Sequence, residues 1–119
     1  MVANFVRAWE SADVAALVAL LTDDVFLTMP PMSFEYEGLD LASSFCASIF
    51  RAGRRFDLRP TRANRQPAFG AYLRGRHSSS QGVGLYVLTF AGDRIRGLTR
   101  FDDSLLPAFG LPQSLRTSG

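Results

Sequence analysis

The stretch VGLYVLTFAGDRIRGLTRF, residues Val83 to Phe101, decides the fold. Its first eight residues are apolar on both faces of an extended chain, which is typical of a strand in the middle of a sheet. The tripeptide AGD at 91–93 predicts a hairpin turn, and a second strand follows over 94–101. Alternation predicts Ile95 and Phe101 on one face of that strand. The other face would carry Arg94, Arg96, Leu98 and Arg100.

Three further strands are predicted earlier in the chain. Residues 25–29 are β-branched and aromatic, and Pro30-Pro31 ends this strand because proline cannot donate to a ladder. Residues 55–64, RFDLRPTRAN, alternate apolar and charged side chains, and the strand AFGAYLRGR at 68–76 follows a turn at Gln66-Pro67. The run HSSSQG at 77–82 predicts a polar hairpin loop. The segment DDSLLPAFGLP at 102–112 is expected to fold over an edge of the sheet.

The N-terminal part predicts three helices. Val2, Phe5, Val6 and Trp9 form one apolar stripe at helical spacing, and the same spacing recurs from Val14 to Leu21. Ser11 or Asp13 is a natural N-cap between the two helices. Residues 22–24, Thr-Asp-Asp, are expected to close the pair. A third helix is predicted over 39–52, ended by Gly53, and its apolar face would carry Leu41, Phe45 and Ile49.

The order of these elements predicts the fold class. Helices come first and an antiparallel meander comes last, which is typical of an α+β domain. We expect a cone-shaped, curved, mixed or antiparallel sheet wrapped on three N-terminal helices, as a single domain over residues 1–119. The open end of such a cone is a pocket.

Composition narrows the function classes. The chain has 119 residues and a net charge of +2, which is too weak to indicate nucleic-acid binding by itself. The single cysteine, Cys46, excludes an internal disulfide and a multi-cysteine metal site. No apolar run reaches the roughly 18 residues of a membrane helix, and the N-terminal stretch does not have the pattern of a signal peptide. We therefore expect a cytoplasmic protein without a membrane partner.

Several short motifs, in order, carry a resemblance to a known family. They are AWESADVAALVALLTDDV, MPP, YEGLD, PTRANRQPAFGAYLRG and LPAFGLP. The chain resembles the SnoaL-like branch of the nuclear-transport-factor-2-like superfamily, within the α+β roll class. MPP, ANRQPAF and FGLP together look most like the accessory C-terminal domain of extracytoplasmic-function sigma factors. The chain is then either an excised domain or a stand-alone relative.

The resemblance implies several partners and functions. It implies a pocket for an apolar or aromatic small molecule, a homodimer through the sheet face, and contact with RNA polymerase or sigma-factor regions if the chain is part of a longer protein. The alternative is a stand-alone enzyme, a polyketide cyclase, hydrolase or dehydratase acting on a hydrophobic ring compound. A third hypothesis is a pure interaction module that dimerises through the open sheet face.

Catalytic groups known in the superfamily can be sought at matching positions. A mechanism of the ketosteroid-isomerase type needs a carboxylate base and an oxyanion tyrosine, and the resemblance puts Met29 and Phe5 there, neither of which moves a proton. For an epoxide hydrolase, Arg100 and Asp102 could pair on one face of a strand, but a surface ion pair is the simpler interpretation. Other residues available to such a site are Asn64, Tyr72 and Tyr86.

The enzyme hypothesis needs a buried carboxylate with a raised pKa. The candidates, in order, are Asp102, Glu35 and Asp57. Glu35 and Glu37 flank Tyr36 and share a face of an extended segment, so either the glutamates or Tyr36 point inward. We favour outward, solvated glutamates, because two buried like charges would need partners.

Other reactive residues have simpler interpretations. We expect His77 in a surface loop and Cys46 as a small buried apolar residue. With a single histidine we predict no metal site, and no cofactor is predicted. Arg94, Arg96 and Arg100, with Arg74 and Arg76, indicate a solvated sheet face or a dimer interface, or else contact with an acidic partner. The predicted ligand pocket comprises Trp9, Met29, Tyr36, Asn64, Phe69, Tyr72, Tyr86 and Phe101.

Overall fold

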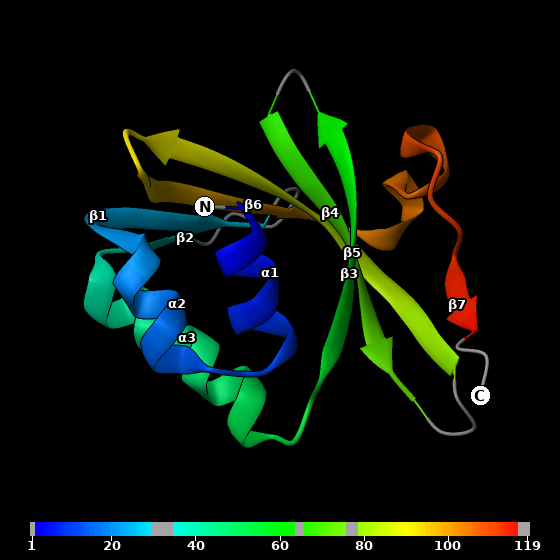
Figure 1. The fold of residues 1–119 in the computed structure, drawn as a ribbon, viewed down its shortest axis with the longest axis horizontal. Coiled ribbons are helices and arrows are strands. Elements are labelled where there is room, and N and C mark those ends of the chain that lie inside the picture. The colour runs from blue at the N-terminus through cyan, green and yellow to red at the C-terminus, as the bar shows by residue number, and fades with distance from the viewer. Residues whose placement is uncertain (1, 30–34, 64–65, 76–78, 117–119) are drawn as a thin grey trace.

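Three helices cover one side of a twisted sheet, and the C-terminal segment lies on the other side (Figure 1). The computed structural model describes residues 2–29, 35–63, 66–75 and 79–116. The helices are α1 (Val2–Glu10), α2 (Val14–Leu20) and α3 (Leu39–Arg51). The strands are β1 (Leu21–Thr28), β2 (Glu35–Glu37), β3 (Phe56–Ala63), β4 (Gln66–Arg74), β5 (Ser79–Ala91), β6 (Arg94–Phe101) and β7 (Ser114–Arg116). Two short 3-10 helices, η1 (Asp103–Leu105) and η2 (Pro107–Phe109), precede β7.

The sheet is mixed, with the strand order β2-β1-β6-β5-β4-β3. β1 and β6 are parallel, and the other neighbouring pairs are antiparallel. The predicted α+β class with three N-terminal helices is confirmed. β5 is central, as its apolar faces predict, and its first residues, Ser79 to Gln81, also pair with β7. None of the helices in the described ranges is long and apolar enough to cross a membrane.

Two β-bulges bend the sheet. Between β4 and β5, Ala71 pairs with Gly84 and Tyr72 pairs with Gly82, so Val83 is an extra residue on β5. Between β5 and β6, Thr89 pairs with Gly97 and Phe90 with Ile95, which makes Arg96 the extra residue on β6. A bulge bends its strand and increases the local twist. The two bulges therefore curve the sheet around the helices.

The bulge at Arg96 corrects a predicted strand face. Alternation placed Ile95 with Phe101 and placed Leu98 on the opposite face. In the structure Ile95 and Leu98 both belong to the core under the helices, whereas Phe101 packs in a second apolar cluster. One extra residue reverses the direction of every side chain that follows it. The prediction was therefore wrong from the bulge onward.

The helices follow the sequence pattern with two corrections. Asp13 is the N-cap of α2, and its side chain accepts a hydrogen bond from Ala16 N at 3.1 Å. On α3 the most buried residues are Ala42, Cys46 and Phe50, whereas Leu41 is 53% exposed, so its predicted place on the apolar face was wrong. The segment 22–24, predicted as a turn, belongs to β1.

An aromatic cluster centred on Trp9 joins the helices to the sheet. Trp9 is 1% exposed and contacts the rings of Phe50, Phe56 and Tyr86 at centroid distances of 5.2, 6.0 and 5.3 Å. Aromatic pairs add about 0.5–1.5 kcal/mol each beyond the area that they bury. This cluster fixes α1 and the end of α3 against β3 and β5.

The C-terminal segment packs over the outer face of the sheet. Leu106, between η1 and η2, is fully buried against β4 and β5. Tyr72 donates from its hydroxyl to Pro112 O at 2.7 Å, and Gly82 N donates to Gln113 O at 2.8 Å. The segment was predicted to cover an edge, but it covers a face and adds β7 to the start of β5.

Gly97 provides a test of the parallel β1–β6 contact. A Cβ on Gly97 would lie within 3.0 Å of three ring carbons of Phe26, its partner on β1. We expect Gly97→Ala to lower the free energy of unfolding by about 1–3 kcal/mol, because the ring must move. Urea unfolding measures this change.

Gly75→Ala is the matched control, because the nearest atom to its Cβ would be Ser79 O at 3.4 Å. It should change stability by less than about 0.5 kcal/mol. In Phe26→Leu/Gly97→Ala the cost should be smaller than the sum of the single changes. Equal stability of Gly97→Ala and the wild type would contradict the close packing.

Candidate functional site

A cavity of about 330 Å³ lies between the inner face of the sheet and α3. This volume is within the range of small-molecule sites, which begins at about 300 Å³. Most of the wall is apolar, and residues from both layers contribute to it. Among them are Leu27, Met29, Phe45, Ile49, Phe56 and Leu98.

The polar groups at this wall are donors and cations. Arg54 and Arg100 both line the cavity, together with Trp9, Thr28, Tyr36 and Tyr86. None of the described lining residues is acidic. The wall thus combines an apolar body with positive charge, which is an uncommon combination for a purely structural void.

The bulge in β5 helps to position Arg100. Its Nη2 donates to the carbonyl oxygen of Val83, the bulged residue, at 2.8 Å. Its Nη1 lies 4.0 Å from Met29 Sδ. A Cβ on Gly84 would be 3.1 Å from Arg100 Nε and 2.7 Å from Phe101 O, so glycine is needed where the guanidinium crosses β5. The charge of Arg100 is therefore held on the inner face.

Burial keeps two ionisable groups of this region neutral. Burial raises the pKa of Tyr86 to about 12, although nearby Arg100 acts in the opposite direction. Burial also raises the pKa of Cys46 to about 11. The predicted interpretation of Cys46 as a buried apolar residue agrees with its 5% exposure. At neutral pH Tyr86 is a phenol that can donate a hydrogen bond into the cavity.

One polar atom of Trp9 has no hydrogen-bond partner in the part of the chain that the structure describes. Its Nε1 is buried, and no described residue accepts its hydrogen bond. A buried donor without an acceptor costs about 1–3 kcal/mol. Less than 1 Å² of this atom is accessible, so the cost belongs to the packing around Trp9 and not to the cavity.

The structure brings together four of the eight predicted pocket residues. Trp9, Met29, Tyr36 and Tyr86 line the cavity. Asn64 lies outside the described residues. Phe69, Tyr72 and Phe101 are not among the residues that line the cavity.

Phe69, Tyr72 and Phe101 lie away from the cavity. Phe69 stacks on Phe5 in the core, at a centroid distance of 5.7 Å. Tyr72 belongs to the outer cluster under the C-terminal segment, and Phe101 packs against it. Phe69 faces the helices but packs on α1 and not in the cavity wall. Tyr72 lies three residues further along β4, so ordinary alternation directs it to the opposite face. The bulge at Arg96 turns Phe101 to that outer face.

Sequence reasoning missed the two cationic wall residues. Arg100 was assigned to an outward arginine face, and Arg54 was not considered. Phe45 and Ile49 line the cavity from α3, and their helical spacing had placed them together on an apolar face. The apolar spacing along α3 could therefore have predicted this part of the cavity wall. No local signal marks Arg54, because it lies between α3 and β3.

Each predicted carboxylate has a place outside the cavity wall. Glu35 and Glu37 are exposed on β2, and Tyr36 between them lines the cavity, as the favoured interpretation had it. Asp102 is the N-cap of η1, and hydrogen bonds from the hydroxyl and backbone N–H of Ser104 lower its pKa. A lowered pKa is the opposite of what a buried catalytic acid requires.

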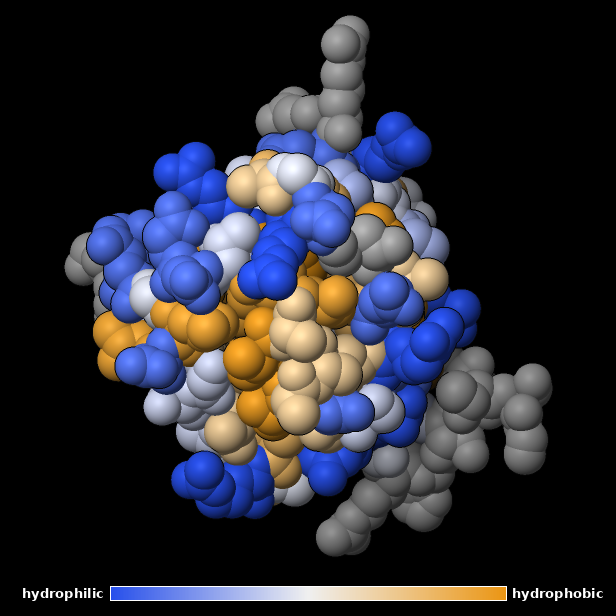
Figure 2. Space-filling model, turned by 60° about the vertical axis from the view of Figure 1, so that its left-hand side comes forward, coloured by the Kyte–Doolittle hydropathy of each residue, from blue (hydrophilic) through white to orange (hydrophobic). Residues whose placement is uncertain are grey.

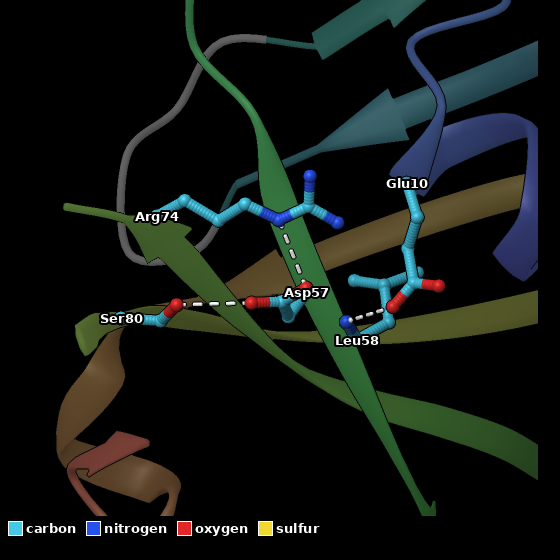
Figure 3. Close-up of polar contacts among 5 residues, drawn as sticks. All are labelled: Glu10, Asp57, Leu58, Arg74 and Ser80. Carbon is cyan, nitrogen blue, oxygen red and sulfur yellow. Dashed lines mark hydrogen bonds and ion pairs between the residues drawn. The ribbon is translucent and has the colours of Figure 1, made fainter. Parts of the chain in front are cut away.

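Asp57 belongs to a polar network that spans three neighbouring strands, β3, β4 and β5 (Figure 3). Its carboxylate accepts hydrogen bonds from Arg74 Nε and Ser80 Oγ, both at 2.9 Å. Close by, Glu10 accepts a hydrogen bond from Leu58 N at 2.8 Å, so the end of α1 protects the free edge of β3. The hydrogen bonds of Asp57 link β3 to β4 and β5, so its carboxylate stabilises the sheet.

The predicted arginine face is divided among different environments. Arg74 pairs with Asp57 at 2.9 Å and Arg96 with Asp24 at 3.7 Å. Arg94 is exposed at the start of β6, whereas Arg100 lines the cavity. Arg76 and His77 lie outside the described residues. The structure therefore does not bring the described arginines together as a single surface.

The two positions that the isomerase comparison singled out differ in location. Met29, at the end of β1, is part of the cavity wall. Phe5 is 2% exposed and stacks on Trp9 in the core. No cluster of three or more His, Cys, Asp or Glu side chains suitable for a metal ion is found within the described ranges.

Comparison with known proteins adds a family relationship. A model of SnoaL-like domains matches residues 2–101. The chain is 34% identical over 120 residues to the ECF RNA polymerase sigma factor SigG of Mycobacterium tuberculosis. The alignment covers 97% of this chain and 32% of SigG, so the chain spans about a third of the length of that relative.

Solved structures of low identity share the fold. An NTF2-like protein from Mesorhizobium loti is 19% identical, with a TM-score of 0.69 over 85% of this chain and 86% of that chain. An LEH-like epoxide hydrolase of M. tuberculosis is 16% identical, with a TM-score of 0.65 over 87% of this chain and 80% of that chain. At these identities the likeness concerns the fold alone.

The neutral phenol of Tyr86 predicts a pH dependence of stability. The pKa rises from 10.0 for a free phenol to about 12 in the folded state. Its contribution is present in full below pH 10 and is lost as the pH rises through 12, because the unfolded chain releases the proton first. We expect the free energy of unfolding to fall by up to about 1.4 kcal/mol per pH unit from this group.

Tyr86→Phe should remove that part of the slope, as urea unfolding at a series of alkaline pH values would measure. Cys46→Ser is a useful comparison. The pKa of the Cys46 thiol rises from 9.0 to about 11, so the stability that this thiol contributes is lost at lower pH than the contribution of Tyr86. Identical slopes for Tyr86→Phe and wild type would show that the phenol is not buried.

Proposed function

The chain belongs to the family of SnoaL-like domains, and on this premise we propose that it is a regulatory domain that binds a small apolar or aromatic molecule. The observation that carries the proposal is the cavity of about 330 Å³ with its largely apolar wall. Protein interiors are normally packed without such spaces. A retained cavity of this size therefore supports ligand binding.

The regulatory part of the proposal is supported by the similarity to SigG. We propose that the domain acts beside the DNA- and polymerase-binding regions of a sigma factor in the cytoplasm. Occupancy of the cavity would change how the domain contacts those regions or RNA polymerase. Alternatively, we propose that the domain pairs with a second copy of itself through the sheet face.

The enzyme alternative needs a group that transfers a proton at the cavity wall. Of the candidates, Asp102 caps η1, Asp57 binds Arg74 and Ser80, and Glu35 is exposed. Tyr86 stays protonated until about pH 12, which makes it a poor base. These environments favour binding over catalysis as the proposal.

Binding at the cavity can be tested by filling it. Ile49→Trp places a large side chain in the wall, and we expect it to weaken binding of the neutral fluorescent probe N-phenyl-1-naphthylamine by at least about tenfold. The fluorescence of the probe in a titration measures this change. The matched control is Leu41→Trp on the same helix, because Leu41 is 53% exposed and is not a wall residue.

The control should bind the probe as the wild type does. If Ile49→Trp and Leu41→Trp bind equally well, the probe occupies another place and the cavity is not the site. If the wild type binds no probe, the small-molecule proposal fails.

The sigma-factor proposal makes a prediction about the gene. We expect the reading frame upstream of codon 1 to continue, in frame, over about 150 or more residues, the size of at least one further domain. Sequencing the genomic DNA tests this expectation. A stop codon directly upstream would contradict the sigma-factor proposal and leave ligand binding by a stand-alone protein to be tested on its own.

A further inference from the structure

The charges around the cavity are unbalanced. Arg54 and Arg100 line it, and the described lining residues contribute no carboxylate. The two ion pairs found among the described residues, Arg74–Asp57 and Arg96–Asp24, involve other arginines. The positive charges of this largely apolar space are therefore not neutralised by a described side chain of the wall, and burying such charges without a partner costs free energy.

Arg100 keeps donors available for a ligand. A guanidinium has five N–H groups, and the contacts seen are one hydrogen bond to Val83 O and a long approach to Met29 Sδ. The nearest acid along the strand is Asp102, but both the hydroxyl and the backbone N–H of Ser104 bind its carboxylate. Asp102 thus weakens the positive potential around Arg100 but accepts no hydrogen bond from its guanidinium.

Arg54 complements Arg100 from a different element. It lies between α3 and β3, and its side chain is exposed while also lining the cavity. Its neighbour Arg55 has a structural role, because Arg55 Nη1 donates to Phe50 O at the end of α3. Arg54 makes no comparable hydrogen bond among the described residues. Its guanidinium is therefore free to meet a ligand at the rim.

We propose that the cavity selects an amphipathic organic acid, a ring-sized apolar body that carries a carboxylate bound by Arg54 and Arg100. This inference rests on the proposed function and specifies its ligand class. The apolar body would lie against side chains such as Ile49, Phe45 and Leu98. Arginine suits a carboxylate because its planar fork donates two parallel hydrogen bonds.

A neutral donor fits the same ligand. Tyr86, at the cavity wall, is a phenol able to donate, whereas Trp9 Nε1 is too deeply buried to meet a ligand. Donors at a cavity wall favour a ligand that is rich in acceptor oxygens. An ammonium ligand would meet two like charges, and a neutral hydrocarbon would leave the remaining donors of Arg100 and Arg54 without a partner.

Three compounds with the same naphthalene ring test the charge preference. They are 2-naphthoic acid, 2-naphthylmethanol and 2-naphthylmethylamine, which are anionic, neutral and cationic near neutral pH. Their affinities are measured by displacement of N-phenyl-1-naphthylamine from the 119-residue chain. We expect the acid to bind about tenfold more tightly than the alcohol and the amine to bind most weakly.

Paired variants test the assignment to the two arginines. Arg100→Gln and Arg54→Gln should each weaken binding of 2-naphthoic acid by about fivefold or more and leave the alcohol within about twofold. The controls are Arg94→Gln, exposed on the same strand as Arg100, and Arg51→Gln, exposed at the end of α3. Retained binding of the alcohol shows that each variant is folded.

The outcomes separate the two proposals. If the probe and the alcohol bind but the acid is not preferred, the organic-acid inference is wrong and the proposed function stands. If the acid is preferred but Arg94→Gln and Arg51→Gln weaken it as much as the cavity variants do, general surface charge explains the preference and the inference is again wrong. If neither the probe nor any of the three compounds binds, both proposals fail.

Discussion

The bulge at Val83 in β5 bends the sheet, and the cavity on the inner face, the packing of the C-terminal segment on the outer face and the position of Arg100 all depend on this bend. β5 is a long strand that pairs with β6 over its second half and with β7 at its start. The extra residue bends the strand between these two parts. Its inner side curves around Trp9 and the cavity, and its outer side receives Leu106 and the C-terminal segment. The carbonyl of the same residue also binds Arg100.

The core and the cavity are parts of a single aromatic arrangement. Trp9 packs on Phe50, Phe56 and Tyr86, and it also lines the cavity together with Phe56 and Tyr86. The rings that stabilise the helix layer therefore also form part of the cavity wall. Atoms that line an empty space lose dispersion contacts, and such a local loss of stability is typical of functional sites.

Charge distinguishes this cavity from an ordinary packing defect. Burying an arginine side chain on the inner face of a sheet costs free energy unless it finds partners. Arg100 has a carbonyl, and the remaining donors face a space that Arg54 also lines. These two arginines therefore set the chemistry that we propose for the cavity.

The sequence by itself determined the order of the three helices and the five longer strands, the central position of β5 and the cap at Asp13, and it favoured the inward direction of Tyr36 between two exposed glutamates. These features follow from local periodicity and from the hydrogen-bonding habits of single residues, which act over a few neighbours. Only the tertiary structure decided that Leu98 and Arg100 face inward and that Phe101 faces outward. The reason is that a bulge shifts register by one residue, and the pairing that creates it depends on a partner strand far along the chain.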